Sequence, residues 1–456
     1  MNRDALRAEL AAMGRLAAPV TAAQVGQVSM GFIDTVMVGQ LGPTALAGVA
    51  LGNTLFFFVL IVTTGVIQGV NPMVSQAVGR RDHAAVTRSV RQGLWLAVGL
   101  GVPAVALLWF AEPALHGMGQ APAAVAQATG YLHAIVWGLP AALGYQALRS
   151  FAEGLARPVP VTVITYGGVA LNIAANYALM FGAGPLPALG LVGTGWATTL
   201  VFWFMFALLA GLTYAGRPFR MYPLWHRLRT PDLRMLRALV YVGGPMGVSR
   251  GIEAGLFTLT ALMAGTLGTT ALAAHQIALQ TVAFVFMVPV GLSIAGSVRV
   301  GQAAGRGDAA GVRRAGWLAM ALAGSAMGIS AVVFWTWPAA IVRVYLAAEG
   351  THTAAVAQAA AHLLGIAAFF QVVDGLQVAA HGALQGLKDT RVPMLIALCT
   401  YWGIGLSSGY VAGLQWGYGV YGLWWGLVVG LAAAAVALIA RFRQQVHRLP
   451  AAATRT

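Results

Sequence analysis

Three carboxylate residues lie inside long apolar segments of the sequence, where an ionised side chain is costly. Asp34, Glu253 and Asp374 stand apart from the other acidic residues, which lie in or near polar connecting stretches. At the centre of a membrane helix each such charge costs at least about 2.5 kcal/mol. Three of them would offset much of the stability of an ordinary domain, which is about 5 to 15 kcal/mol. These carboxylates must therefore face water, bind a cation or carry a proton, since burial favours the neutral form.

The neighbours of these acids could hold a cation through charge and through aromatic rings. Gln371 lies three positions before Asp374, on the same face of a helix, and Phe370 precedes it. A carboxylate beside amides and rings can bind a dehydrated metal ion or an organic cation. Asparagines in a helix bundle serve equally often as hydrogen-bonding links between helices. A second polar stripe, at about four-residue spacing, comprises Asn172, Asn176 and Tyr177.

The same residues also allow structural or catalytic interpretations. Arg250 lies three positions before Glu253, so the two could form a fixed ion pair. Ser249 lies in a Gly-x-Ser-x-Gly sequence, the nucleophile motif of some hydrolases, but that motif needs a preceding strand and this one falls within a predicted helix. We interpret it as a chance match. His275 and His381 are expected to be hydrogen-bonded packing residues, because no second ligand lies at metal-binding spacing.

The composition requires that membrane helices position these residues. Of the 456 residues, 59% are hydrophobic and only 9% are charged, whereas soluble domains carry about 25% charged residues. The alternating segments typical of an outer-membrane barrel are absent. The chain is predicted to be an all-α membrane protein with twelve transmembrane helices, near residues 15–39, 45–72, 92–111, 127–149, 160–182, 190–213, 238–264, 271–298, 315–337, 357–382, 392–413 and 420–440.

The net charge of +15 follows a membrane topology and does not indicate a nucleic-acid partner. Arginines cluster at both ends of the chain and in every second connection, and the positive-inside rule then places both termini in the cytoplasm. The longest polar stretch divides the chain into an N-terminal lobe, 1–215, a cytoplasmic linker, 216–236, and a C-terminal lobe with a basic tail, 237–456. Cys399 is the single cysteine, so no disulfide can form within the chain.

The two lobes are internal repeats. The constant shift that places Gly39 on Gly265 also places the run Gln76–Arg88 on Gln302–Arg314, with many identities and no gap. Because each repeat has an even number of helices, both copies enter the membrane from the same side, an arrangement typical of transporters. Glu253 falls on Gln27 and Asp34 on Thr260. Neither acid is duplicated, which favours a functional role over a packing role.

Several segments resemble the multidrug and toxic compound extrusion (MATE) transporters. They are Phe32–Gly39 followed by Leu41-Gly42, and the Gln-Ala-x-Gly-Arg pieces at 76–80 and 302–306. The acids on predicted helices seven and ten are similar to those of the NorM-like branch. The resemblance covers essentially the whole chain. It implies a MATE/MOP-type fold, in which two six-helix pseudo-symmetric lobes form a V-shaped bundle that rocks between inward and outward openings.

The resemblance also implies roles for individual residues. Glu253 and Asp374 would be the cation site, and would bind Na⁺ in a Na⁺-coupled member, while Asp34 would handle protons or substrate. Phe286 stands where some Na⁺-coupled members have a tyrosine, which leaves the coupling ion open between Na⁺ and H⁺. No other cofactor is implied. The residues expected to line the substrate cavity are Asn172, Asn176, Tyr177, Phe286, Gln371 and Phe370.

We therefore expect a multidrug efflux transporter of the bacterial inner membrane that is not an enzyme. It would export amphipathic organic cations, such as drugs and dyes, in exchange for Na⁺ or H⁺ by alternating access, as a monomer surrounded by membrane lipid. One alternative is a flippase for lipid-linked sugars. It would need a basic cavity for pyrophosphate, and only Arg250 among the arginines is expected well inside a helix. An intramembrane hydrolase acting through Ser249 or His381 is a further alternative, and a passive channel would differ in never accumulating solute uphill.

Overall fold

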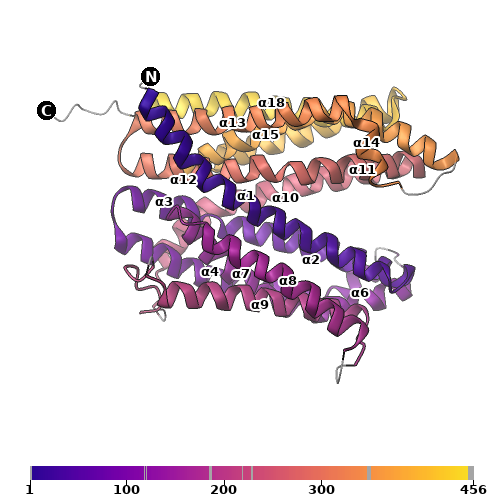
Figure 1. Ribbon diagram of the computed structural model, residues 1–456, viewed down its shortest axis with the longest axis horizontal. Helices are drawn as coiled ribbons and strands as arrows, with labels where there is room; N and C mark the ends of the chain where they lie inside the picture. The colour runs from indigo at the N-terminus through magenta and orange to yellow at the C-terminus, as the bar shows by residue number, and fades with distance from the viewer. Residues whose placement is uncertain are drawn as a thin grey trace. The chain divides into compact units, whose positions relative to one another are not determined.

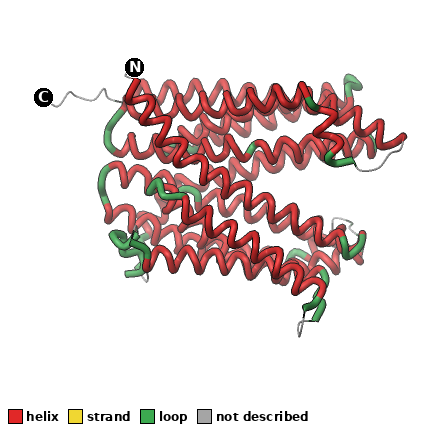
Figure 2. The backbone as a smooth tube through the Cα atoms, in the orientation of Figure 1, coloured by secondary structure: helices red, strands yellow, loops and turns green. Residues whose placement is uncertain are grey.

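The computed structural model is helical through most of its described residues, which are 3–449 except 118, 120, 184–186, 218, 227, 229 and 347–350. Figure 2 shows helices joined by loops, without a strand in this described part. Ten helical segments are long and apolar enough to cross a membrane. Two more long helical segments, 122–154 and Leu233–Thr266, correspond to the remaining two of the twelve predicted helices. The predicted all-α membrane fold is confirmed.

The chain folds as two compact units. The N-terminal unit is Ala22–Gly247, and the C-terminal unit is Met1–Thr21 together with Val248–Thr456. Two long helices, α1 (Arg3–Gly39) and α10 (Leu233–Thr266), contribute residues to both units. Each contains a proline, Pro19 or Pro245, two positions before the division. The divisions therefore fall at the same place in each repeat.

Helices of the N-terminal unit bury an apolar core that includes Phe56, Leu139 and Phe151. Within it α8 packs along α9, α6 packs against α2, and α4 packs against α7, as Figure 1 shows. Besides parts of α1 and α10, the elements are α2 (Pro43–Ile67), α3 (Val70–Gly79), α4 (His83–Trp109), α5 (Glu112–Gly117), α6 (Pro122–Ile135), η1 (Val136–Gly138), α7 (Leu139–Gly154), α8 (Val159–Phe181) and α9 (Leu191–Ala215).

The connection between α9 and α10, which the sequence predicts to be a linker, packs onto the N-terminal unit. The side chains of Phe219 and Leu224 are fully buried in its core. The indole N–H of Trp95 donates to the backbone carbonyl of Leu228 at 2.7 Å. Burial raises the pKa of the Tyr222 hydroxyl, and the positive charge of Arg157 opposes that rise. This connection is thus an ordered surface layer in the residues that the structure describes.

In the C-terminal unit, the long helix α15 packs against α11, α12, α13 and α18. Residues 391–415 form one helical segment with two π-helical stretches, η2 and η3. The elements are α11 (Thr269–Val285), α12 (Met287–Gly305), α13 (Ala309–Thr336), α14 (Pro338–Arg343), α15 (Thr351–Gly386), α16 (Arg391–Ala397), η2 (Leu398–Leu406), α17 (Ser407–Tyr410), η3 (Val411–Gln415) and α18 (Gly419–Arg448).

Glycines allow α18 to lie directly against this π-helical segment. A Cβ on Gly426 would collide with the backbone of Gly409. The same holds one turn away in each direction, for Gly422 against Gly413 and for Gly430 against Gly405. Small residues let membrane helices approach closely. The four-residue glycine spacing in α18 is therefore a packing face.

The sequence repeat is also a repeat of backbone structure. Gly42 and Gly268, which precede α2 and α11, have positive φ angles of 98° and 111°. The carboxylate of Asp82 accepts a hydrogen bond from the amide of Ala85 at 2.8 Å, which caps α4. Asp308 caps α13 through the amide of Gly311 at 2.7 Å. These pairs are related by the same shift that places Gly39 on Gly265.

Candidate cation and substrate site

Two carboxylates and one guanidinium form a polar cluster in the C-terminal unit. On α10, Arg250 and Glu253 form an ion pair with an N–O distance of 3.5 Å, and their side chains are 31% and 23% exposed. Asp374 on α15 is buried and interacts electrostatically with both. The hydroxyl of Tyr401, from η2, interacts electrostatically with all three charged groups. We call Arg250, Glu253, Asp374 and Tyr401 the C-terminal cluster.

The neighbours of Asp374 differ in what they can offer a ligand. The side-chain oxygen of Gln371 accepts a hydrogen bond from the Ser330 hydroxyl at 3.2 Å. Its buried amide nitrogen has no hydrogen-bond partner among the described residues. Phe370 is 1% exposed and packs edge-on against Trp424, with ring centroids 5.5 Å apart. Gln371 thus has hydrogen-bonding capacity to spare, whereas Phe370 is held in the apolar core.

Phe286 occupies a junction between helices. It lies between the end of α11 and the start of α12, in a helical backbone conformation, and is half-buried. The side chain of a phenylalanine offers a ring face but no oxygen, so at this position the side chain can contribute a cation–π contact but no oxygen ligand.

A second carboxylate site lies in the N-terminal unit. Asp34 on α1 accepts hydrogen bonds from the side-chain amides of Asn172, at 3.0 Å, and of Asn176, both on α8. Both asparagines are buried, and their side-chain oxygens have no hydrogen-bond partner in the described chain. The phenol of Tyr131, on α6, interacts electrostatically with Asp34. The structure therefore joins three of the predicted residues in one polar group.

Tyr177 is not part of this group. The sequence analysis put it on one stripe with Asn172 and Asn176, but its side chain is 62% exposed and lies beside Phe181, with ring centroids 6.0 Å apart. Successive residues in an α-helix differ by about 100° in direction. The face that turns Asn176 toward Asp34 therefore carries Tyr177 away from it.

The C-terminal cluster is suited to a monovalent cation or a proton. Among the described residues, no group of three or more His, Cys, Asp or Glu is placed to hold a metal ion. Glu253, Asp374 and the Tyr401 hydroxyl offer oxygen atoms, which hard cations prefer. A proton needs only one of the carboxylates. The donor set is thus compatible with either coupling ion.

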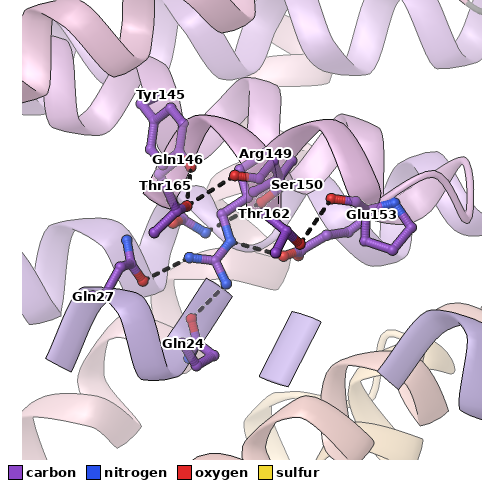
Figure 3. Close-up of polar contacts among 11 residues, drawn as sticks. Gln24, Gln27, Tyr145, Gln146, Arg149, Ser150, Glu153, Thr162 and Thr165 are labelled. Atoms are coloured by element: carbon purple, nitrogen blue, oxygen red, sulfur yellow. Dashed lines mark hydrogen bonds and ion pairs between the residues drawn. The ribbon is translucent and has the colours of Figure 1, made fainter. Parts of the chain in front are cut away.

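The structure adds a charged pair that sequence reasoning missed, shown in Figure 3. Arg149 and Glu153 on α7 are both buried, and Nε of Arg149 donates to Glu153 at 2.7 Å. Nη1 donates to the side-chain oxygen of Gln27 at 2.7 Å, and Nη2 to that of Gln24, both on α1. We call these four residues the N-terminal cluster. The expectation that only Arg250 lies well inside a helix is wrong, because α7 continues to Gly154.

The histidines and the serine of the alternative interpretations lie within helices. Nδ1 of His275 accepts a hydrogen bond from the indole N–H of Trp424 at 3.1 Å, as expected of a packing residue. Nε2 of His381 is buried without a hydrogen-bond partner in the described residues. Ser249 lies inside α10, and no strand-to-helix turn precedes it. The geometry of a nucleophile elbow is therefore missing at Ser249.

The chain is similar to known proteins over nearly its whole length. The MatE family model matches residues 19–178 and 245–411. The probable multidrug resistance protein NorM of Pseudomonas aeruginosa is 40% identical over 446 residues, which cover 98% of this chain and 91% of that protein. The multidrug resistance protein NorM of Burkholderia vietnamiensis is 40% identical over 96% of this chain and 94% of its own length.

Solved structures share the fold at low sequence identity. A crystal structure of MATE in complex with MaL6 matches with a TM-score of 0.89 at 19% identity, and the match covers 96% of each chain. The eukaryotic MATE transporter AtDTX14 matches with a TM-score of 0.86 at 18% identity, over 97% of this chain and 98% of that one. These two likenesses bear on the fold alone.

Proposed function

Because the chain belongs to the MATE family, as its resemblance predicted, and is a multi-pass multidrug efflux transporter, we propose that it is an antiporter driven by Na⁺ or H⁺ at the C-terminal cluster. The supporting observation is a charge count. Glu253 and Asp374 supply two carboxylates, whereas Arg250 supplies one guanidinium. With all three ionised, one negative charge has no positive partner within the cluster, and a cation or proton from solution would compensate it.

Coupling follows if the exported compound and the ion need the same negative charge. Amphipathic organic cations would bind where the ion has left, and each ligand would stabilise the conformation that the other disfavours. A ligand can shift a conformational equilibrium only by its difference in affinity for the two states. Competition for Glu253 and Asp374 supplies that difference. In this proposal the lobes 1–215 and 237–456, joined by 216–236, alternate between inward and outward access.

Asp34 would act as a second ligand-binding carboxylate, for a proton or for substrate. Asn172 and Asn176 hold it by two hydrogen bonds, and their own free oxygens could accept from a ligand. Gln371, Phe286 and Tyr177 complete the proposed set of substrate contacts, whereas Phe370, which the sequence analysis also assigned to the cavity, is buried in the apolar core and is left out of the set. We also place the protein in the inner membrane as a monomer in contact with lipid, with both termini in the cytoplasm, because of the arginine distribution.

The other functions considered are not favoured. Flipping of a lipid-linked pyrophosphate needs guanidinium groups free to bind it, but Arg149 already donates to three side chains and Arg250 is paired with Glu253. Hydrolysis would need a reactive serine on a sharp turn, and Ser249 lies within a continuous helix. The relatives named as multidrug resistance proteins support efflux.

Neutralising either carboxylate tests this proposal. We expect Glu253→Gln and Asp374→Asn each to reduce ethidium efflux from reconstituted vesicles at least about 100-fold, since the lost charge interaction is worth about 3 kcal/mol. Na⁺ and H⁺ gradients imposed separately would identify the coupling ion. Glu112→Gln, which changes a half-exposed carboxylate on α5, should keep the wild-type rate. Wild-type efflux by the Glu253 or Asp374 variant would contradict the assignment.

A further inference from the structure

The N-terminal and C-terminal clusters occupy corresponding places in the two repeats. On the first helix of each repeat, the shift that places Gly39 on Gly265 also places Pro19 on Pro245. The same shift places Gln24 on Arg250 and Gln27 on Glu253. The two amides that accept hydrogen bonds from Arg149 therefore correspond to the ion pair of the C-terminal cluster.

The backbone also fixes the correspondence between α7 and α15. Two positions beyond the end of each helix lies a residue with positive φ, Ala156 at 58° and Lys388 at 61°. The next amide in each chain segment donates back into the helix, from Arg157 to the Ala152 carbonyl at 2.9 Å and from Asp389 to the Leu384 carbonyl at 3.0 Å. Aligning these two helix ends places Arg149 on His381 and Glu153 on Gln385.

A packing contact supports the same register. A Cβ on Gly154 would press against Val74, and one on Gly386 would press against Val300. Val74 and Val300 are themselves related by the shift that places Gly39 on Gly265. The two helix ends are therefore equivalent in their contacts as well as in their backbone geometry.

The two clusters differ in charge and in access. In the N-terminal cluster one guanidinium faces one carboxylate, and the ion pair at 2.7 Å is about 4% exposed on both sides. In the C-terminal cluster one guanidinium faces two carboxylates, at a looser 3.5 Å and with 31% and 23% exposure of the ion pair. His381, at the position of Arg149, interacts electrostatically with Arg250 but makes no hydrogen bond through Nε2 in the described residues. With every group ionised, the first cluster is neutral, whereas the second has one carboxylate more than it has guanidinium groups.

We propose that Arg149 is a tethered cation that fills, in the N-terminal unit, the position corresponding to the cation site of the C-terminal unit. It would thereby determine that only one of the two repeated clusters takes up a mobile ion. The inference rests on the proposed function, since it treats the C-terminal cluster as the coupling site. Arg149 is a specificity-determining residue in this scheme and does not itself contact substrate.

Removing the guanidinium tests the scheme. Arg149→Gln leaves the buried Glu153 carboxylate without a counter-charge, and an unpaired buried charge is strongly unfavourable. We expect the purified variant to gain about one cation equivalent per chain relative to the wild type. The gain would be detected either as bound radioactive sodium or as a new infrared C=O band of a protonated carboxyl group.

Two further variants serve as controls. Arg149→Lys keeps the tethered charge and should keep the wild-type cation count. Arg149→Gln combined with Glu153→Gln removes both charges, so it should also keep the wild-type count and the wild-type ion dependence of ethidium efflux. If the folded Arg149→Gln variant binds the same number of cations per chain as the wild type, the proposal is overturned. If that variant does not fold, a changed count in the folded double variant would overturn it equally.

The background of Glu253→Gln with Asp374→Asn separates this inference from the proposed function. If the C-terminal cluster is the coupling site, that background loses the wild-type ion, and adding Arg149→Gln restores about one cation equivalent. If the background binds the ion as well as the wild type does, the proposed function fails. Adding Arg149→Gln to this background still tests the role of Arg149. If this addition does not increase the number of bound cations, the proposed role of Arg149 is contradicted.

The converse experiment introduces a guanidinium group into the C-terminal cluster. His381→Arg puts a guanidinium at the position corresponding to Arg149 and balances the excess carboxylate. We expect radioactive sodium binding or the proton-dependent infrared band at this cluster to be lost, while the midpoint of thermal unfolding shows that the protein is folded. Retention of wild-type ion binding by a folded His381→Arg variant would argue against the tethered-cation scheme.

Discussion

Ion pairs of the same two residue types have different surroundings in the two units. The Arg149–Glu153 pair, four positions apart on α7, is closed to solvent and surrounded by amides. The Arg250–Glu253 pair, three positions apart on α10, is partly exposed and shares its surroundings with Asp374. A buried pair with all its hydrogen bonds made is costly to break, whereas a loose and partly exposed pair can exchange partners. Exposure and charge balance thus distinguish the Arg149–Glu153 pair from the pair that we propose to bind a ligand.

A third charged pair gives a prediction about stability. Arg299 on α12 donates two hydrogen bonds to the buried carboxylate of Glu9 on α1, at 2.8 and 2.7 Å, within the C-terminal unit. Glu9→Ala leaves the guanidinium unpaired, and we expect it to lower the free energy of unfolding by about 3 kcal/mol. Thermal unfolding in detergent would measure the change. Arg7→Ala, at an exposed position nearby on the same helix, should change stability by less than about 0.5 kcal/mol.

The candidate site could be predicted from the sequence only where charge stood out against an apolar background. Asp34, Glu253 and Asp374 were identifiable because each interrupts a predicted membrane helix. Sequence analysis misses Arg149 because the apolar run 127–149 ends at that residue, which places Glu153 in a polar connection. The four-residue spacing of these two charges on one helix face was the available signal. The partners Gln24 and Gln27 lie far away in sequence, and only the folded packing brings them to Arg149.

At the scale of helices, the observed helical segments extend beyond the apolar runs that predict them, and they do so in the same way in both repeats. The sequence predicts helices at 45–72 and 271–298, whereas the corresponding helical segments extend over 44–79 and 269–305. A hydropathy pattern detects the part of a helix that lies in lipid. The helical backbone extends beyond the apolar part, and it ends shortly before Asp82 and Asp308, which cap the N-termini of the following helices α4 and α13. Helix number was therefore predictable and helix length was not.

The glycine face of α18 provides a prediction at this scale. Gly426→Ala forces a Cβ into the backbone of Gly409, so we expect the free energy of unfolding to fall by about 2 kcal/mol. Gly403→Ala, in the π-helical stretch η2, meets nothing within 4 Å and should leave stability unchanged or raise it slightly, since alanine favours helix over glycine. The midpoint of thermal unfolding would measure both changes. Equal effects of the two substitutions would contradict the packing argument.

For the whole molecule, the arginine pattern predicts which connections face the cytoplasm. In a Cys399→Ser background, Gln40→Cys should react in intact cells with a maleimide that does not cross membranes. Arg80→Cys should react only after the cells are opened, since its connection is arginine-rich. Gln40 and Arg80 are both exposed in the structure, so the access of the maleimide depends on which side of the membrane each residue faces. The reverse labelling pattern would place both termini outside.

The repeat made the architecture predictable over the whole chain. It required two sets of helices with the same orientation, and the structure repeats even the caps and the positive φ angles. It could not predict the charge difference between the clusters, because side chains can diverge on a shared backbone. The alignment of the two repeats also changes before α15. The shift that places Gly39 on Gly265 would place Arg149 on Gly375, whereas the helix ends place it on His381. The counterpart of Arg149 could therefore be identified only from the folded helix ends.

The unequal clusters give a physical reason for keeping both repeats in one polypeptide. Two identical six-helix chains assembled as a homodimer would carry the same residues in both halves, so each substitution would appear twice. Joining the duplicated genes removes that constraint. In our proposal one copy keeps Arg149 as a permanent cation, while the other, with His381 at the same position, binds an ion from solution. Divergence after gene fusion would thus allow a symmetric scaffold to bind its ion in one repeat only.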